Sequence, residues 1–383
     1  MIAWFRYICL IVSLIITMPE LLSAQRLVSQ RQEDVEAGLL YNESVYILSN
    51  YSCLSSNSPE KLSLDELLRK QIEGFYFYLK RDTETNVLLL RKPDGTFTPF
   101  SESLEAIKTA LDADSTKVMT LFLDFYVETE LESSFKEIGL MEYVLEYDTK
   151  NGWPSLKDML SSGKRLVVFE VQKHLNSPSW LHNMRDFVEH TDADWGNQPE
   201  GVESFDERLK KNLSLFTGYK FLETSRGNSN DISALARQTP YLIESFKRAW
   251  IRDGRVPNFI LVDKYYAWLD VSLVTFRNFD IIYGAVTNNN ELLNYVNWDG
   301  MSNYTTGKYC FPLEPGAELM LSPISPGYRI EPATVYVSGT QRKAFAGDFK
   351  ARPLRIDEDI EIYLPFEGDE KDGSSNHNLT VSR

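Results

Sequence analysis

The sequence predicts a (β/α)8 barrel followed by a β-rich C-terminal segment. Short apolar runs, such as KVMTLFLDF at 117–125 and RLVVFEV at 165–171, are typical of strands that are covered on both faces. Most of these runs alternate with helical patterns, which is the order of elements in a parallel α/β barrel. After Asn288, prolines interrupt the strand-like runs, which indicates a segment of different character. A doubly wound open sheet is the alternative, because periodicity does not show whether a sheet closes.

The barrel prediction rests on a series of strand-like runs that spans about 245 residues. The runs lie near residues 45, 75, 87, 119, 166, 220, 259 and 281. Helical patterns separate most of them, at 64–72, 101–111, 128–138, 154–162, 231–253 and 271–279. The segment 174–218 is the least regular. We therefore predict the barrel at 25–286, a β-rich segment at 287–366 and a disordered tail at 367–383.

Residues 1–24 have the pattern of a secretory signal. Arg6 precedes an apolar run from Ile8 to Met18, and Leu22-Ser23-Ala24 resembles a cleavage site. The run is shorter than the ~20 residues that a membrane-spanning helix needs. We therefore expect a secreted, periplasmic or extracellular protein without a transmembrane segment in the mature chain. Export leaves Cys53 and Cys310, which either pair in a disulfide or remain two thiols.

The formal net charge of −15 limits the partners. A strongly acidic chain does not suit nucleic acid, nor electrostatic capture by an anionic membrane surface. Local cations stand out against this charge in GFYFYLKRDTETNVLLLRK at 74–92, which reads as two short strands joined by a polar turn. Lys80 and Arg81 end the first strand, and Arg91 and Lys92 end the second. Since barrels build sites at strand ends, we expect these cations at the mouth; solvated strand-end charges are the alternative.

The order of these pieces resembles the X-domain family of phosphatidylinositol-specific phospholipase C. The resemblance covers roughly residues 44–286 and is carried by LSLDELLRKQIEGFYFYL, PFSESLEAIKTALDADSTKVMTLFLDF, WPSLKDMLSSGKRLVVFE and VPNFILVDKYY. The most specific piece is WPSL…GKRLVVF. The resemblance implies a barrel of the phosphoric diester hydrolase class.

In that family, as the resemblance implies, one histidine after the first strand takes the inositol hydroxyl proton, and a second after the third strand protonates the leaving group. Here Asn50 stands at the first position and Arg91 at the second. Asparagine does not titrate and arginine stays protonated, so neither can transfer a proton. Tyr76 replaces a family arginine, and Glu170 stands where many members have a lysine that neutralises phosphate.

Other positions match the family. By resemblance, Arg81 is the arginine that holds the phosphate, and Asp263 is the carboxylate that orients the first histidine. Asp124 matches a carboxylate of the calcium-dependent members. In those members, other residues on the second strand would bind the metal together with this carboxylate. Here the corresponding positions, near Phe77 and Leu79, are apolar, so we expect no metal site and no cofactor.

The remaining histidines offer little replacement chemistry. His174 follows a predicted strand by three residues, so it either reaches the mouth or is a surface histidine. We expect His182 and His190 to be solvated, and His377 lies in the predicted tail. The chain has no Gly-x-Ser-x-Gly and no His-Glu-x-x-His.

The residues are compatible with three functions. In the first, the barrel has lost acid–base catalysis, and Arg81, Arg91 and Lys92 hold a phosphoester, an inositol-phosphate-like small molecule or a lipid head group. In the second, the protein is an active phosphodiesterase in which Asp124 or Asp263 acts as the base. In the third, the barrel is a non-catalytic surface or adhesion scaffold.

Overall fold

The structure is a computed structural model of the whole chain. It describes residues 31–49, 51–53, 63–69, 72–125, 131–147, 150–172, 174, 177–191, 215–218, 247, 250–251, 254, 256, 258–262, 278–301, 304–339 and 342–355. The chain divides into two compact units: unit 1 comprises Met1–Phe246 and Val256–Asn278, and unit 2 comprises Lys247–Arg255 and Phe279–Arg383. The predicted signal and the predicted tail lie outside the described residues. No helix among the described residues is long and apolar enough to cross a membrane.

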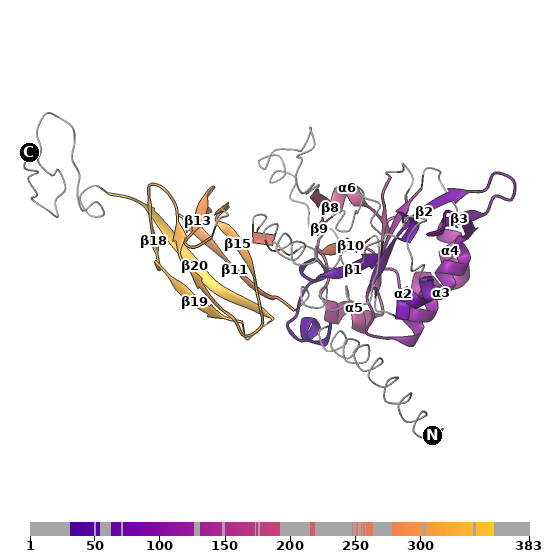
Figure 1. Cartoon of the computed structure of the whole chain (residues 1–383), viewed down its shortest axis with the longest axis horizontal. Helices are drawn as coiled ribbons and strands as arrows, with labels where there is room; N and C mark the ends of the chain where they lie inside the picture. The colour runs from indigo at the N-terminus through magenta and orange to yellow at the C-terminus, as the bar shows by residue number, and fades with distance from the viewer. Residues whose placement is uncertain are drawn as a thin grey trace, which may run out of the picture. The chain divides into compact units, whose positions relative to one another are not determined.

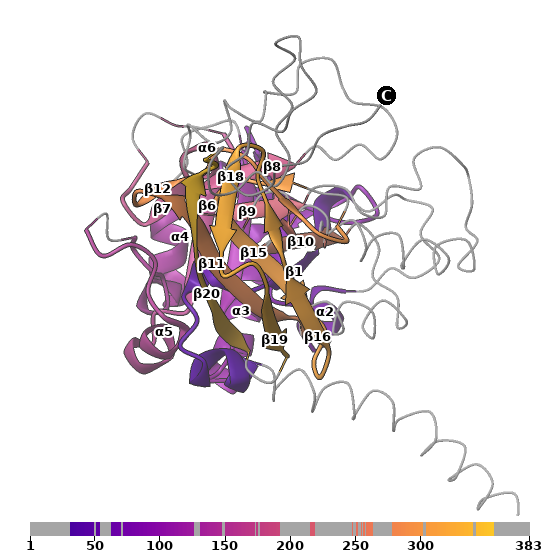
Figure 2. The same cartoon turned by 90° about the vertical axis from the view of Figure 1, so that its left-hand side faces the viewer.

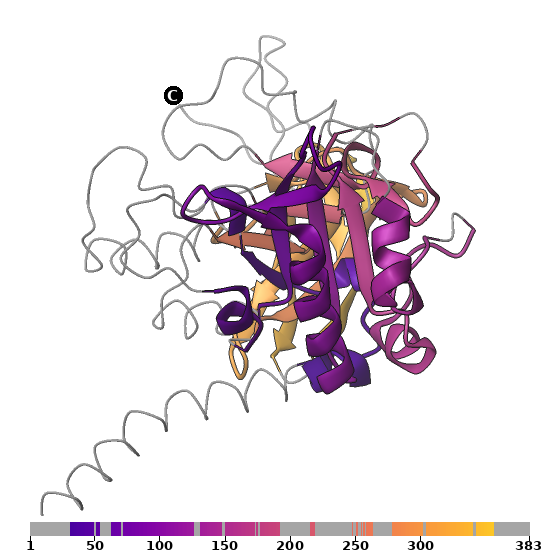
Figure 3. The ribbon, with the colours of Figure 1, turned by 90° about the vertical axis from the view of Figure 1, so that its right-hand side faces the viewer.

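Unit 1 is built on parallel strands (Figures 1 and 3). Along the sheet they follow the order β7, β6, β5, β2, β1, β10, β9, β8, and every neighbouring pair is parallel. Their bounds are β1 Tyr46–Ser49, β2 Gly74–Arg81, β5 Met119–Asp124, β6 Leu166–Glu170, β7 Leu181–Asn183, β8 Val188–Thr191, β9 Leu215–Gly218 and β10 Phe259–Val262. The two ends of this order, β7 and β8, are joined in the chain by α6 (Met184–Phe187).

Aromatic rings show how this sheet closes. The ring centroid of Phe122 on β5 lies 5.2 Å from that of Phe259 on β10, although β2 and β1 separate the two strands in the sheet. Phe169 on β6 lies 6.1 Å from the same Phe259 ring. Neighbouring strands are about 4.8 Å apart, so these rings would not meet on a flat sheet. The sheet therefore curls around them, and they fill the barrel interior. The predicted barrel is confirmed, and the open-sheet alternative is wrong.

Two of the predicted barrel strands are not in the barrel. The run near 87 forms β3 (Leu88–Arg91), which pairs antiparallel with β2 and with β4 (Phe97–Pro99). The run near 281 forms β11 (Asp280–Asn288), which belongs to unit 2. Both runs are apolar because one of their faces packs on a helix or on a core, and sequence periodicity does not distinguish that burial from a place in a barrel.

The barrel strands that the sequence did not predict are β7, β8 and β9. They lie in the segment that we predicted to be irregular, because LHN and VEHT are short and polar. The run that we predicted near 220 does not overlap β9, which ends at Gly218, and it lies outside the described residues. A strand of three or four residues is too short to establish a period of two against its neighbours, so only the pairing with neighbouring strands identifies these segments as strands.

The helices of unit 1 lie on the side of the strands away from the interior rings (Figure 3). Their bounds are α2 Leu64–Arg69, α3 Phe100–Ala113, α4 Leu131–Ile138 and α5 Leu156–Ser162, and the short 3-10 turns are η1 Tyr41–Glu43, η2 Tyr51–Cys53 and η3 Leu140–Glu142. The Phe100 ring of α3 packs 5.9 Å from Phe77 of β2. At α5, Ser155 caps the first turn and Gly163 ends the helix with a φ of 73°, close to the bounds that Pro154 and Gly163 predict.

His182 lies in the barrel interior, so the prediction of a solvated histidine is wrong. Its ring is 4% exposed and lies among the rings of Trp153, Phe169 and Phe187. The register pairs it with Phe169, which places it on the interior face of β7. Its Nε2 donates to the carbonyl oxygen of Leu145 at 3.2 Å. Burial lowers the pKa of His182, and this hydrogen bond opposes the shift only in part.

We expect the free energy of unfolding to decrease as the pH falls below about 6.5. The unfolded chain binds a proton on His182 near that pH, whereas the folded ring stays neutral, so acid favours the unfolded state until the lowered pKa of the folded state is passed. Denaturant titrations at a series of pH values measure this slope. A His182→Phe variant should lose the part of the slope that lies just below pH 6.5; an unchanged slope in the variant would contradict this assignment.

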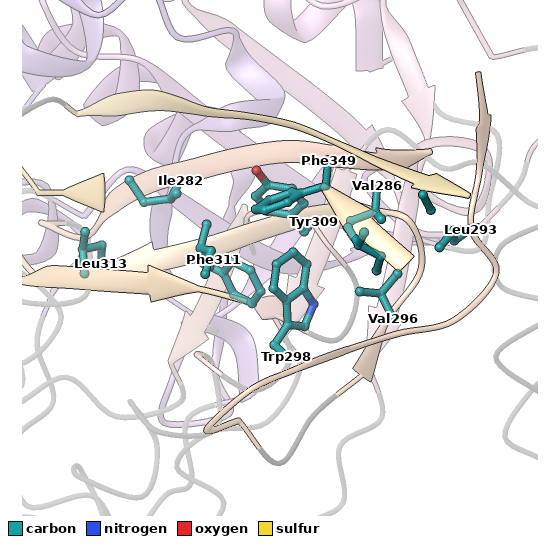
Figure 4. Close-up of a cluster of buried hydrophobic side chains, with 12 residues drawn as sticks. Ile282, Val286, Leu293, Val296, Trp298, Tyr309, Phe311, Leu313 and Phe349 are labelled. Atoms are coloured by element: carbon teal, nitrogen blue, oxygen red, sulfur yellow. The ribbon is translucent and has the colours of Figure 1, made fainter. Parts of the chain in front are cut away.

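Unit 2 is β-rich, as predicted (Figure 2). Its further strands are β12 Glu291–Leu292, β13 Val296–Trp298, β14 Tyr304–Thr305, β15 Lys308–Leu313, β16 Glu318–Leu321, β17 Pro323–Ile324, β18 Tyr328–Glu331, β19 Val335–Ser338 and β20 Lys343–Pro353. One sheet has the order β12, β11, β20, β18, with β15 paired to β11. Its core surrounds the Trp298 indole, which contacts the rings of Tyr309, Phe311 and Phe349 (Figure 4).

The pairing of Cys53 with Cys310 stays a prediction, because the Cys53 side chain lies outside the described residues. Cys310 is buried on β15. Its sulfur accepts a hydrogen bond from the Trp250 indole nitrogen at 3.0 Å. The Cys310 side chain is therefore part of the packing of unit 2.

Candidate active site at the barrel mouth

One face of β2 packs on α3, and the other faces the barrel interior. Phe75, Phe77 and Leu79 are buried, and Phe77 packs on α3. The alternate residues lie on the interior face, because the register pairs Tyr76 with the interior ring of Phe122. Along this interior face exposure increases towards the carboxyl end of the strand, from buried Gly74 to exposed Lys80. We call this carboxyl-end continuation of the interior face the mouth face.

A carboxylate lies on the mouth face at the end of β5. The Asp124 side chain is half-buried, and its Oδ2 accepts a hydrogen bond from the Tyr76 hydroxyl at 2.8 Å. Its Oδ1 lies 3.5 Å from Nε2 of Gln172, just beyond the end of β6. Asp124 pairs in register with Tyr78, which is also half-buried. Hydroxyl, carboxylate and amide groups therefore meet at one place on the rim, as they do in sites that bind polar ligands.

The cations near β2 do not form one cluster. β2 continues past the barrel as an antiparallel ribbon with β3 and β4, in which Lys80 lies opposite Leu89 and Arg81 opposite Leu88. Because successive side chains alternate, Arg91 shares the face of Leu89 and Lys80, which is the mouth face. Arg81 shares the other face with Leu79 and lies on the α3 side. The register therefore places Arg81 and Arg91, which we predicted to act together, on opposite faces of the ribbon.

The mouth face of the ribbon is exposed and cationic. Arg91 and Lys80 are both exposed, and the Lys80 ammonium lies 3.7 Å from the centroid of the Phe97 ring. On the α3 side, Leu79 and Leu90 are buried, and the Thr98 hydroxyl donates to Glu102 of α3 at 2.6 Å. Packing on α3 thus fixes which face of the ribbon remains on the mouth side.

Ser52 joins the loop after β1 to this ribbon. Its side chain is buried, and its hydroxyl accepts from the Tyr78 backbone N–H at 2.8 Å and donates to the Arg91 carbonyl oxygen at 3.0 Å. The hydroxyl thereby bridges β2 and β3 where their direct pairing ends. Asn50, two residues earlier in the chain, lies outside the described residues, as does Asp263. The description of the site therefore does not include these two predicted site residues.

A second polar cluster faces away from the mouth. Glu170 is 1% exposed, and the register pairs it with Leu123, on the side opposite the interior rings. Its carboxylate accepts from the Ser177 hydroxyl at 2.6 Å and from the Asn183 amide at 3.1 Å, and its Oε2 lies 3.0 Å from the His174 Nδ1. The His174 ring stacks on Phe125. Through these contacts Glu170 holds the loop after β6 in place. His174 contacts Glu170 and Phe125 in this cluster and does not lie beside Asp124 at the mouth.

Sequence reasoning expected Asp124, Lys80 and Arg91 at strand ends but missed Tyr78 and Gln172 as mouth residues. A signal for Tyr78 exists in GFYFYLKR. Once Tyr76 is placed on the interior face, a period of two places Tyr78 and Lys80 there as well, and Arg81 on the opposite face. Lys92, the third predicted cation, follows β3 and is half-buried. Gln172 has no such signal, because it follows its strand.

The residues around Asp124 do not fit calcium. This cation takes roughly six to eight oxygen ligands. Here Asp124 is bonded to Tyr76 and Gln172, and Phe77 and Leu79 face α3. Among the described residues, no group of three or more His, Cys, Asp or Glu side chains is placed to hold a metal ion.

Comparison with known proteins identifies the kind of barrel. The family model described as PI-PLC X 1 matches residues 90–199. The barrel is PI-PLC X-like. The resemblance that the sequence motifs indicated is thereby confirmed, and the matched segment of the X-like barrel runs from the end of β3 to beyond β8. Among curated proteins, none matches the chain.

Solved structures similar to the chain include two bacterial enzymes. One is a variant of the phosphatidylinositol-specific phospholipase C of Staphylococcus aureus, with 14% identity, a TM-score of 0.40, and coverage of 64% of this chain and 97% of that chain. The other is the phosphatidylinositol-specific phospholipase C of Listeria monocytogenes, with 13% identity, a TM-score of 0.40, and coverage of 64% and 98%. The X-like barrel is thus distant from both in sequence.

Proposed function

We propose that this protein is an exported, PI-PLC X-like barrel that binds a phosphoester at its mouth and lacks the acid–base catalysis of the family. The observation that carries the proposal is the place of Arg91. It is exposed on the mouth face, at the position where the family resemblance implies the histidine that protonates the leaving group.

A guanidinium suits binding and does not suit proton transfer. It stays protonated at any pH that a folded protein tolerates, so it cannot donate a proton to a leaving group and recover it. The same fixed charge and fork of N–H donors match the oxygens of a phosphate, often through two parallel hydrogen bonds. Asn50, at the position of the family's base, does not titrate either. A phosphodiester held here would lack both the base and the acid.

The neighbouring groups favour a ligand that carries hydroxyls beside its phosphate. The carboxylate of Asp124 accepts hydrogen bonds, and Tyr76 and Gln172 both donate and accept them. Inositol phosphate, free or as a lipid head group, has this combination of a polyol and an anion. We therefore take it as the ligand class, with Arg91 and Lys80 on the phosphate and the Asp124 group on the hydroxyls.

We expect no turnover of phosphatidylinositol above background, with or without calcium, while isothermal calorimetry with inositol 1-phosphate gives a saturable heat. Arg91→Ala should weaken this binding at least about tenfold, because it removes a charge-assisted contact. Arg81→Ala is the matched control: it removes the same charge from the α3 side of the same ribbon, and it should change the affinity by less than about threefold. Circular dichroism should confirm that both variants fold.

Other results would point to the other functions. Turnover that disappears in Asp124→Asn or Asp263→Asn would establish a phosphodiesterase with rearranged residues. If the protein gives no heat with inositol 1-phosphate and no turnover, the remaining function is that of a non-catalytic scaffold. A loss of binding in Arg81→Ala but not in Arg91→Ala would restore the role that the family resemblance gives to Arg81 and would contradict the face assignment.

A further inference from the structure

One sheet of unit 2 contains β11, β15, β18 and β20, and one of its faces packs on the core while the other faces away from it. Ile282, Phe311 and Phe349 point into the core. The alternate residues of the same strands lie on the other side, which we call the outer face. At its β15 end, the Trp250 indole covers Cys310.

The outer face is basic, although the chain is acidic. By register and alternation it carries the cationic side chains Lys308, Arg329, Lys343, Lys350 and Arg352. The carboxylates among these positions are Glu331, which lies opposite Lys350, and Asp348. Arg329 lies directly opposite Arg352, and its Nε lies 3.2 Å from the Glu331 carboxylate, which offsets part of the repulsion between the two like charges. A net charge of −15 for the chain therefore conceals one face of the opposite sign.

Large apolar side chains project from the same face. Phe345 is 58% exposed, Leu292 is 50% exposed and Tyr283 is 36% exposed. The Phe345 and Tyr283 rings are neighbours, with centroids 5.5 Å apart, and the Lys343 ammonium lies 5.2 Å from the Tyr283 centroid. Aromatic rings interleaved with cations are the composition of surfaces that rest at the boundary between lipid head groups and acyl chains.

We propose that the outer face of unit 2 docks on an anionic lipid surface. The cations supply attraction to acidic head groups, which each basic side chain near the surface strengthens. Phe345 and Leu292 supply apolar contact, which a soluble polyanion would not use. The net charge of the whole chain argued against electrostatic capture by a membrane. A membrane, however, interacts only with the charges on the face that lies within a Debye length of it. This inference does not depend on a ligand in the barrel.

The test uses the full-length mature chain and vesicles without inositol lipid, so that the barrel site is not involved. We expect co-sedimentation with vesicles of phosphatidylcholine and phosphatidylserine, and little with phosphatidylcholine alone. The double variant Lys343→Glu/Lys350→Glu should weaken the partitioning at least about tenfold. Phe345→Ser should weaken it about fivefold and leave its salt dependence unchanged, since it removes apolar contact and no charge.

Tyr336→Ser is the matched control. Tyr336 is 76% exposed, more than Phe345, but lies on β19 of a different sheet, so its loss should change partitioning by less than about twofold. Equal losses in Tyr336→Ser and Phe345→Ser would overturn the proposal, as would the absence of binding to phosphatidylserine vesicles. Binding to heparin that competes with the vesicles and is unaffected by Phe345→Ser would assign the face to a soluble polyanion instead.

Discussion

Replacing Glu170 with lysine is expected to lower the free energy of unfolding by about 4 kcal/mol or more. Lysine is the residue that the family resemblance implies at this position, so the resemblance alone predicts that the substitution restores a phosphate site. The structure predicts the opposite. The Glu170 carboxylate is 1% exposed and accepts from Ser177 and Asn183. An ammonium there would face donors, leave them unpaired and bury an uncompensated charge.

Chemical denaturation with matched variants measures this effect. Glu170→Gln keeps one acceptor oxygen and should cost about 1–2 kcal/mol. Glu137→Lys makes the same change of charge at an exposed position of α4 and should stay within about 0.5 kcal/mol of the unsubstituted protein. A Glu170→Lys protein that is fully stable and hydrolyses phosphatidylinositol would show that residue 170 faces the mouth, and would contradict the register-based assignment.

The second large effect is expected at the buried ion pair of Arg31 and Glu73. Both side chains are nearly inaccessible to solvent, and Arg31 also pairs with Asp34, which is 1% exposed. Glu73 has a second role, because its Oε2 accepts from the Ile47 backbone N–H of β1 at 3.2 Å. Glu73→Ala leaves the guanidinium buried beside the single carboxylate of Asp34, and should therefore lower the free energy of unfolding by about 3–5 kcal/mol.

The stability of a double variant shows whether Glu73→Ala destabilises the protein by breaking the ion pair or only by removing packing. Arg31→Met/Glu73→Leu removes both charges and keeps apolar volume, so it should recover much of the stability lost in Glu73→Ala. The exposed pair of Lys108 and Asp112 is the control, since Asp112→Ala should lower the free energy of unfolding far less than Glu73→Ala does. If the double variant is as unstable as Glu73→Ala, the ion pair is not the source of the effect.

Most barrel strands could be predicted because their local pattern matches their tertiary surroundings. The runs at β5 and β6 are apolar on both sides, with Phe122 and Phe169 inside and Leu121 and Val168 towards the helices. β3 has the same apolar pattern for a different reason, because Leu90 packs on α3 as part of a ribbon. β7 escapes the pattern because it is only three residues long and carries His182 on its interior face.

The candidate site was predictable in type and only partly in geometry. Asp124 ends an apolar strand, and parallel strands bring such ends to one rim, so its place in the site follows from the sequence. Arg81 and Arg91 are alike in the sequence, since each ends a predicted strand. Their separation depends on the antiparallel register of β2 and β3, which pairs Arg81 with Leu88 and therefore places it on the opposite face from Arg91.

The sequence by itself determined the barrel class, the β-rich second unit, and the presence of asparagine at position 50 and arginine at position 91, where the family resemblance implies histidines. These properties reside in residue type and in short-range periodicity, which the chain carries before it folds. Only the tertiary structure decided which strands form the barrel and which face of unit 2 is basic. It also decided that Glu170 is a buried hydrogen-bond acceptor that holds a loop, and that it does not lie at the mouth where the family resemblance implies a phosphate-binding lysine. Those outcomes depend on register, and a shift of one residue in register exchanges the two faces of a strand.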